Sequence, residues 1–131
     1  MWWLSVRSLY NLAMIKSKKY KIPIYRGDFL IIKSDNYKEA FEKFKIPIPD
    51  GEFDLDLFEA FAFSSPYKNK YTRYIILLKD KVSSGTIAHE CNHIVTYMFN
   101  DRQCNNLNND EPACYLLGWL VNRVHEFLDK T

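Results

Sequence analysis

The residues with the clearest chemistry form the pentapeptide His89-Glu90-Cys91-Asn92-His93. Side chains four residues apart lie one above the other on a helix, so the imidazoles of His89 and His93 can bind one Zn²⁺ ion. The carboxylate of Glu90 falls beside the metal, where it can take a proton from an activated water molecule. The motif therefore predicts a zinc site with His89 and His93 as ligands and Glu90 as general base.

The flanking sequence favours a helix at this motif. Residues 71–79 are rich in β-branched and aromatic side chains and predict a strand. A short turn follows, in which Ser83 or Ser84 can cap a helix that runs from residue 86 to about residue 99. The apolar side chains of this helix lie on a different face from the histidines. The alternative is an ordinary buried helix whose histidines only satisfy hydrogen bonds.

A third ligand has to come from outside the motif. Catalytic zinc sites usually have three protein ligands and one open position for water. The extended pattern with a third histidine on the following turns is absent, because position 96 is Thr96 and position 99 is Phe99. The sequence therefore points to an acidic third ligand.

Glu111 is the expected third ligand. The run Asp110-Glu111-Pro112 is typical of a helix start, and the Asn- and Asp-rich residues 100–109 supply a loop through which this second helix can fold back on the first. His125 lies 14 residues after Glu111, about 21 Å along a straight helix, so it cannot bind the same ion. Without a metal, Glu111 would only stabilise the helix N-terminus, by about 0.3–1 kcal/mol. The alternative ligands are Asp110, Cys104 and Cys114.

His89-Glu90-x-x-His93 followed by Glu111 resembles the gluzincin clan of zinc metallopeptidases, whose third ligand is a glutamate on a following helix. It is most similar to the small, single-domain minigluzincins, including short zincin-like proteins encoded by bacteriophages. Residues 110–117 are similar to the acidic-Pro-x-x-Tyr-Leu helix of those phage proteins. The resemblance covers roughly residues 70–125 and implies a zincin-like fold and zinc-dependent hydrolysis of a peptide or protein substrate.

One position departs from the pattern of thermolysin-like members, which carry an aspartate four residues after the glutamate ligand. Here that position is Tyr115, on the same predicted helix face as Glu111. A phenol near the metal would be a candidate for stabilising an oxyanion; the alternative is a tyrosine packed at a helix–helix contact. Gly118 continues the same stripe, where a glycine lets another backbone approach closely.

The other elements are predicted from periodicity and turn residues, and with the two helices above they indicate an α+β fold. We expect a small twisted sheet packed against the histidine-bearing helix and the following Glu111-bearing helix, in a single domain of residues 1–131. The substrate would lie along the strand 71–79, unless both edges of that strand are already paired. The expected elements are a helix near residues 2–14, a solvated turn at 16–19, extended segments at 22–25 and 29–33 around a turn at 26–28, a helix at 36–45 capped by Ser34 or Asp35, and a hairpin of 57–63 with 71–79 across 64–69.

Composition excludes some partners. A net charge of +2 without a basic cluster indicates no nucleic acid, and no apolar run is long enough for a transmembrane segment. An odd number of cysteines, 3, without framework spacing is typical of reduced thiols, which predicts a cytoplasmic location, in the host cytoplasm if the chain is phage-encoded. The amino-acid composition is compatible with a phage or low-GC source, because it is rich in Lys, Asn, Tyr, Phe and Ile. Trp2 and Trp3 belong to an N-terminal helix that is expected to pack on the core, or alternatively to bind a membrane surface or a partner protein.

The leading hypothesis is a zinc metallopeptidase of narrow specificity. Few residues follow Glu111, so we expect a shallow substrate cleft rather than a deep one. A dedicated protein target, or self-processing during phage assembly, would fit such a cleft. Two alternatives remain: a catalytically silent zincin-fold structural or protein-interaction module, and a metal-dependent hydrolase that acts on a non-peptide amide.

Overall fold

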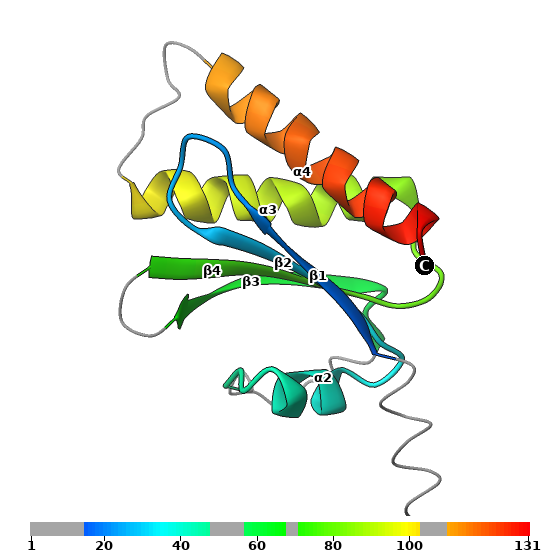
Figure 1. The fold of residues 1–131 in the computed structure, drawn as a ribbon. Coiled ribbons are helices and arrows are strands. Elements are labelled where there is room, and N and C mark those ends of the chain that lie inside the picture. The colour runs from blue at the N-terminus through cyan, green and yellow to red at the C-terminus, as the bar shows by residue number, and fades with distance from the viewer. Residues whose placement is uncertain (1–14, 48–56, 68–70, 103–109) are drawn as a thin grey trace, which may run out of the picture.

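The computed structural model describes residues 15–47, 57–67, 71–102 and 110–131 (Figure 1). It has an α+β fold with a four-stranded mixed sheet and three helices in these ranges, as the sequence predicted at this level. The elements follow one another as β1 (Lys16–Lys21), β2 (Asp28–Lys33), α2 (Tyr37–Lys43), β3 (Ala60–Tyr67), β4 (Tyr71–Leu78), α3 (Ser84–Asp101) and α4 (Glu111–Asp129).

The sheet has the strand order β1-β2-β4-β3. Strands β1 and β2 pair antiparallel, β2 and β4 pair parallel, and β3 and β4 pair antiparallel. The chain passes from β2 to β4 through α2 and β3, which supplies the long connection that a parallel pair requires. The strand order makes β2 and β4 the inner strands and β1 and β3 the outer strands.

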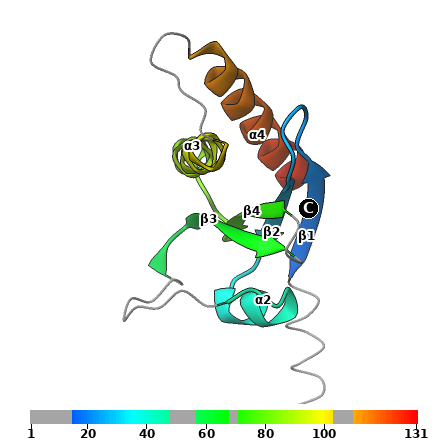
Figure 2. The same cartoon turned by 90° about the vertical axis from the view of Figure 1, so that its left-hand side faces the viewer.

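Helices cover both faces of this sheet (Figures 1 and 2). Alternate side chains of β2 and β4 point to opposite faces, so Phe29 and Ile76 pack beneath α3 and α4, whereas Leu30 and Ile75 pack against α2. Both inner strands are consequently buried almost throughout, as expected of strands with helices on either side. The sheet thus gives α3 a rigid platform.

Two predictions at the N-terminal side of the sheet are wrong. Residues 16–19 form most of strand β1 rather than a solvated turn, because an edge strand tolerates lysines on its exposed positions. Residues 22–25 belong to the connection between β1 and β2 rather than to a strand. Pro23 has no backbone N–H for a ladder, Tyr25 N–H donates to its carbonyl at 2.7 Å, and Ile24 has φ 69°.

The remaining predictions differ in their bounds. Helix α2 is shorter than residues 36–45, and its N-cap is Asn36, whose side chain accepts from Glu39 N–H, rather than Ser34 or Asp35. Strand β3 extends through residues that were expected to form the turn of the hairpin. The predicted N-terminal helix with Trp2 and Trp3, and most of the loop 100–109 with Cys104, lie outside the described residues.

Candidate metal centre

Helix α3 begins at Ser84, two residues before the predicted start, and its N-cap is one of the two serines that the sequence offered. The side chain of Ser83 is the N-cap and accepts from the backbone N–H of Thr86 at 3.1 Å. The buried face of α3 comprises Ile87, Cys91, Ile94, Val95, Met98 and Phe99. His89 and His93 are exposed and lie on the opposite side of the helix, facing away from the sheet. Packing on the sheet therefore leaves both imidazoles accessible from solvent.

The two imidazoles converge on one point. Nε2 of His89 and Nε2 of His93 are 3.2 Å apart, and the rings are nearly perpendicular, at 81°. Two nitrogens bound to one zinc at 2.0–2.1 Å in tetrahedral geometry would lie about 3.3 Å apart. The separation is that of a hydrogen bond between the two rings, and it is also close to the separation that two ligands of one tetrahedral zinc ion require.

Glu90 lies on the flank of α3 that faces strand β3. Its Oε2 accepts a hydrogen bond from the backbone N–H of Ala62, in β3, at 2.9 Å. The side chain is half-buried, between the sheet edge and the exposed histidine face. A carboxylate in this place can take a proton from a water molecule held between the histidines and the edge of the sheet.

Tyr97 extends the same stripe of α3 by one turn and was not identified from the sequence. Its ring stacks on His93, with 17° between the ring planes and 6.2 Å between the centroids. Burial, and then the charge of Glu90, raise the pKa of its phenol, so it stays protonated near neutral pH. The spacing of four residues from His93 was visible in the sequence, but such a spacing is common in any helix.

Cys91, inside the motif, is fully buried beneath α3. Burial, with a smaller contribution from the charge of Glu90, raises the pKa of its thiol to about 12. It is a small core side chain on the face opposite the histidines, and it does not face the metal centre.

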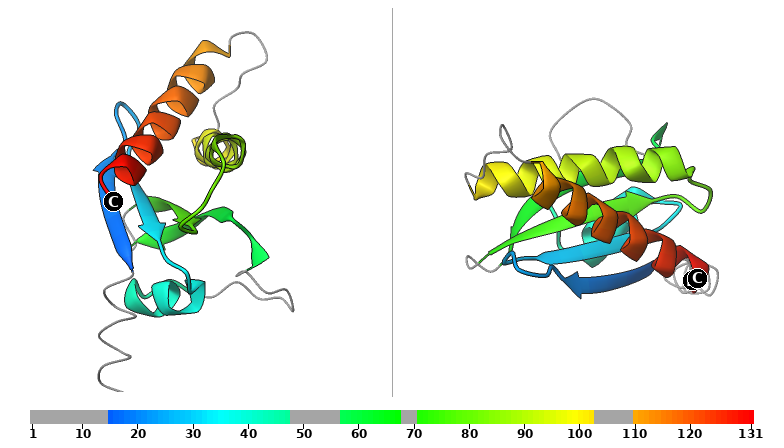
Figure 3. Two further views of the ribbon diagram at one scale, coloured as in Figure 1. Left: turned by 90° about the vertical axis from the view of Figure 1, so that its right-hand side faces the viewer. Right: turned by 90° about the horizontal axis from the view of Figure 1, so that it is seen from above.

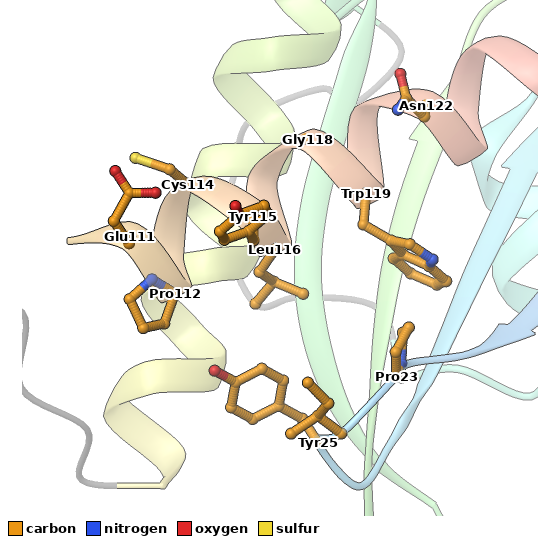
Figure 4. Close-up of a pocket in the computed structure, with 11 residues that line it drawn as sticks. Pro23, Tyr25, Glu111, Pro112, Cys114, Tyr115, Leu116, Gly118, Trp119 and Asn122 are labelled. Atoms are coloured by element: carbon orange, nitrogen blue, oxygen red, sulfur yellow. The ribbon is translucent and has the colours of Figure 1, made fainter.

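The predicted site residues of α4 lie elsewhere in this conformation. Glu111 and Tyr115 line an apolar pocket of about 810 Å³ between α4 and the 22–27 loop, together with Tyr25 and Trp119 (Figure 4). Tyr115 is 77% exposed. Within the described ranges, no three His, Cys, Asp or Glu side chains are grouped closely enough to hold a metal ion. The structure thus brings together two of the three predicted ligands, and Glu111 as the third stays a prediction.

The position of α4 bears on that prediction. Its N-terminal end lies over the outer side of α3, away from the sheet, in the views of Figures 1 and 3. Glu111 is the first residue of α4 and therefore belongs to this end of the helix. A Cβ at Gly118 would meet nothing within 4 Å, so the close backbone approach predicted there is not seen in the described part of the chain.

The sheet edge beside Glu90 is β3, and the prediction that substrate lies along residues 71–79 is wrong. Strand β4 pairs with β2 on one side and β3 on the other, so it has no open edge. The carbonyl of Glu59 accepts from Lys79 N–H at 2.9 Å, which places Glu59 in a hydrogen-bonded pair with the β4 side. Alternation along an antiparallel strand then directs the backbone groups of Ala60, Ala62 and Ser64 outward.

Comparison of the chain with family models, with curated proteins and with solved structures gave no match. No helix in the described residues has the length and apolar character needed to cross a membrane.

Proposed function

We propose that the chain is a zinc-dependent metallopeptidase with a zincin-like fold, of the minigluzincin kind, in which His89, His93 and Glu111 hold the metal. The observation that carries the proposal is the 3.2 Å separation of the two Nε2 atoms, which matches tetrahedral zinc geometry. The Glu90 carboxylate beside them supports hydrolysis rather than a purely structural ion, because a closed structural site needs no base.

Glu90 is the general base of this proposal. A zinc ion, when bound, supplies a Lewis acid that lowers the pKa of water toward ~7 and polarises a carbonyl oxygen. One carboxylate oxygen of Glu90, Oε2, is held by Ala62 N–H, which leaves Oε1 to accept the proton of the attacking water. Glu90 then passes this proton to the leaving amine. Tyr97, protonated and stacked on His93, keeps that imidazole in place, whereas Tyr115 remains the candidate for stabilising an oxyanion.

An extended peptide is the substrate that this site suits best. Ala62 N–H is held by Glu90, and the other outward backbone groups of β3 can pair with a peptide main chain, as in β-strand addition. A non-peptide amide would use the carbonyl chemistry but not the strand edge. The free cysteines Cys91 and Cys114 support a cytoplasmic location, which is the host cytoplasm if the chain is phage-encoded.

Substitution of Glu90 by glutamine tests the proposal. The amide oxygen of glutamine can still accept from Ala62 N–H, so the Glu90→Gln variant keeps the contact with β3 while losing the base. Zinc-loaded wild-type protein should cleave members of a complex peptide mixture, read by mass spectrometry, and Glu90→Gln should bind the same zinc but cleave at least a hundredfold more slowly. Loss of zinc in Glu90→Gln would contradict the assigned roles.

The alternative function is a catalytically silent module that keeps the fold for protein interaction. The observation in its favour is that the described residues do not group a third ligand with the two histidines. Zinc-loaded protein that cleaves nothing in the peptide mixture, and whose biological role survives Glu90→Gln, would favour the module.

A further inference from the structure

The two open edges of the sheet differ sharply in chemistry. Strand β1 has four lysines among its six residues, and charged side chains of this kind prevent other strands from pairing with an edge. Strand β3 has the sequence AFAFSSPY and carries no charged side chain. Among the described residues, the edge beside Glu90 is therefore the one that charged side chains do not protect, although Ala62 N–H already donates to Glu90 and Pro66 has no N–H to offer.

The side chains of β3 separate by face. Ala60 and Ala62 belong to the core beneath α3, and their small size lets the helix and its motif lie close to the strand. Phe61 and Phe63 point to the other face, the face of α2, and both are only half-buried. Phe63 contacts Phe41 of α2 with ring centroids 5.5 Å apart.

The aromatic side chains on that face form a continuous row. Ring centroids are 5.8 Å apart for Phe61 and Phe63, and 6.1 Å apart for Phe58 and Phe61. The row continues into solvent, because Phe58 is 46% exposed and its neighbour Leu57 is 83% exposed. An exposed apolar row along an open strand edge is typical of a binding surface.

A strand added antiparallel to β3 would meet these rings directly. Since the backbone groups of Ala60 and Ala62 point outward, Phe61 and Phe63 occupy the non-hydrogen-bonded positions, where facing side chains come closest, with Cα atoms about 4.5 Å apart. Aromatic side chains at such positions favour aromatic or β-branched partners across the strands. The residue between the two partners would face Ala62 and Glu90.

We infer that this edge selects extended polypeptide segments with two large apolar side chains separated by one residue, and that Phe61 and Phe63 determine this specificity. The intervening residue of the segment lies against the Glu90 side, next to the bond to be cleaved. The inference rests on the proposed function for the cleavage but not for the binding. The α2 face of β3, opposite the zinc motif, would thus select the substrate, whereas the motif would supply only the chemistry of cleavage.

Binding is measured in zinc-loaded Glu90→Gln protein labelled with ¹⁵N, so that turnover does not intervene. The probes are three synthetic peptides of equal length: one with phenylalanines separated by one residue, one with the same phenylalanines adjacent, and one with serines in their place. The first should shift the amide signals of Ala60, Ala62 and Ser64 and should bind about two- to fivefold more tightly for each aromatic pair formed.

The variants are Phe61→Thr and Phe63→Thr, which keep a β-branched residue in the strand. Phe61→Thr is the sharper test, because Phe63 also packs on Phe41. Phe61→Thr should remove one of the two aromatic pairs and so reduce the difference between the peptides about two- to fivefold. The matched control is Ile24→Thr, which removes a 98% exposed apolar side chain in the 22–27 loop and should leave that difference unchanged.

Three results would overturn the inference. They are equal binding of the three peptides, a preference that is undiminished in folded Phe61→Thr protein, and β3 signals that shift with protein concentration alone, which would make a second copy of the chain the occupant. Cleavage by the wild type is scored separately. Selective binding without any cleavage overturns the peptidase proposal and leaves the inference standing, whereas cleavage without preference for this spacing overturns the inference alone.

Discussion

Zinc binding by the histidine pair should stabilise the folded protein by an amount that the geometry allows us to work out. The perturbation is the addition of Zn²⁺ to protein stripped with a chelator. The two Nε2 atoms lie 3.2 Å apart before any metal is considered, and a tetrahedral ion needs about 3.3 Å. Little of the binding free energy is therefore used to move the imidazoles.

The magnitude follows from mass action. At a free zinc concentration of 100 times Kd, a ligand that binds only the folded state adds about 2.7 kcal/mol to the free energy of unfolding. A chain of 131 residues has an unfolding entropy of about 0.28 kcal/mol/K near its Tm. Saturation at this level should raise Tm by about 10 °C, and each tenfold loss of affinity should remove about 5 °C of that rise.

The assay is thermal unfolding followed by circular dichroism at several zinc concentrations, with bound zinc measured by elemental analysis. His93→Ala should lose nearly all of the Tm rise, and Glu111→Ala should lose a large part of it. His125→Ala is the matched control, because it removes the third histidine of the chain, which lies in the C-terminal part of α4, and should leave the rise intact. A wild-type Tm that does not respond to zinc, or an equal response in His93→Ala, would refute the reasoning. A full response in Glu111→Ala would refute only the third ligand.

Three further perturbations test the surroundings of the site. Gly27→Ala should lower the free energy of unfolding by about 1–3 kcal/mol in urea titrations, because Gly27 has φ 139° and an added Cβ would lie 3.0 Å from the carbonyl oxygen of Thr72. Tyr97→Ala should weaken zinc binding about two- to tenfold in a chelator competition, since it removes the ring stacked on His93, and Tyr97→Phe should not. Burial raises the pKa of Cys91 to about 12 in the folded state, so its thiol ionises first in the unfolded state; the stability of the wild type relative to Cys91→Ala should be constant below about pH 9 and should fall by about 1.4 kcal/mol per pH unit between about 9 and 12.

The elements around the motif were predictable because local signals agreed there. Ser83 caps α3, the apolar positions of α3 recur with helical spacing, and the acid–proline start of α4 lies where the helix begins. The second half of strand β4, residues 74–78, is a continuous apolar run, as is usual in buried inner strands. Each of these features depends on residues that are close together in the sequence.

The sheet edges and the third ligand were not predictable in the same way. Lysines at four of its six positions hid the strand character of β1, and which strand borders α3 depends on the crossover from β2 to β4. The neighbours of Glu111 depend on how α4 crosses α3, a tertiary arrangement that no local pattern specifies. Likewise, the contact between the rings of Tyr97 and His93 could not be predicted from their spacing alone.

The contrast between the two edges links the fold to the proposed chemistry. A peptidase that binds substrate as an added strand has to leave one edge of its sheet unpaired, and an unpaired apolar edge favours self-association. This chain places its lysines on β1, the edge remote from the motif, and leaves β3 uncharged beside Glu90. Half-burial of Phe61 and Phe63 limits the apolar area that the open edge exposes, because each ring is partly covered by its neighbour in the row. The lysines protect the edge at β1, whereas at β3 the protection is limited to Pro66 near one end of the strand, which agrees with the proposal that β3 receives the substrate.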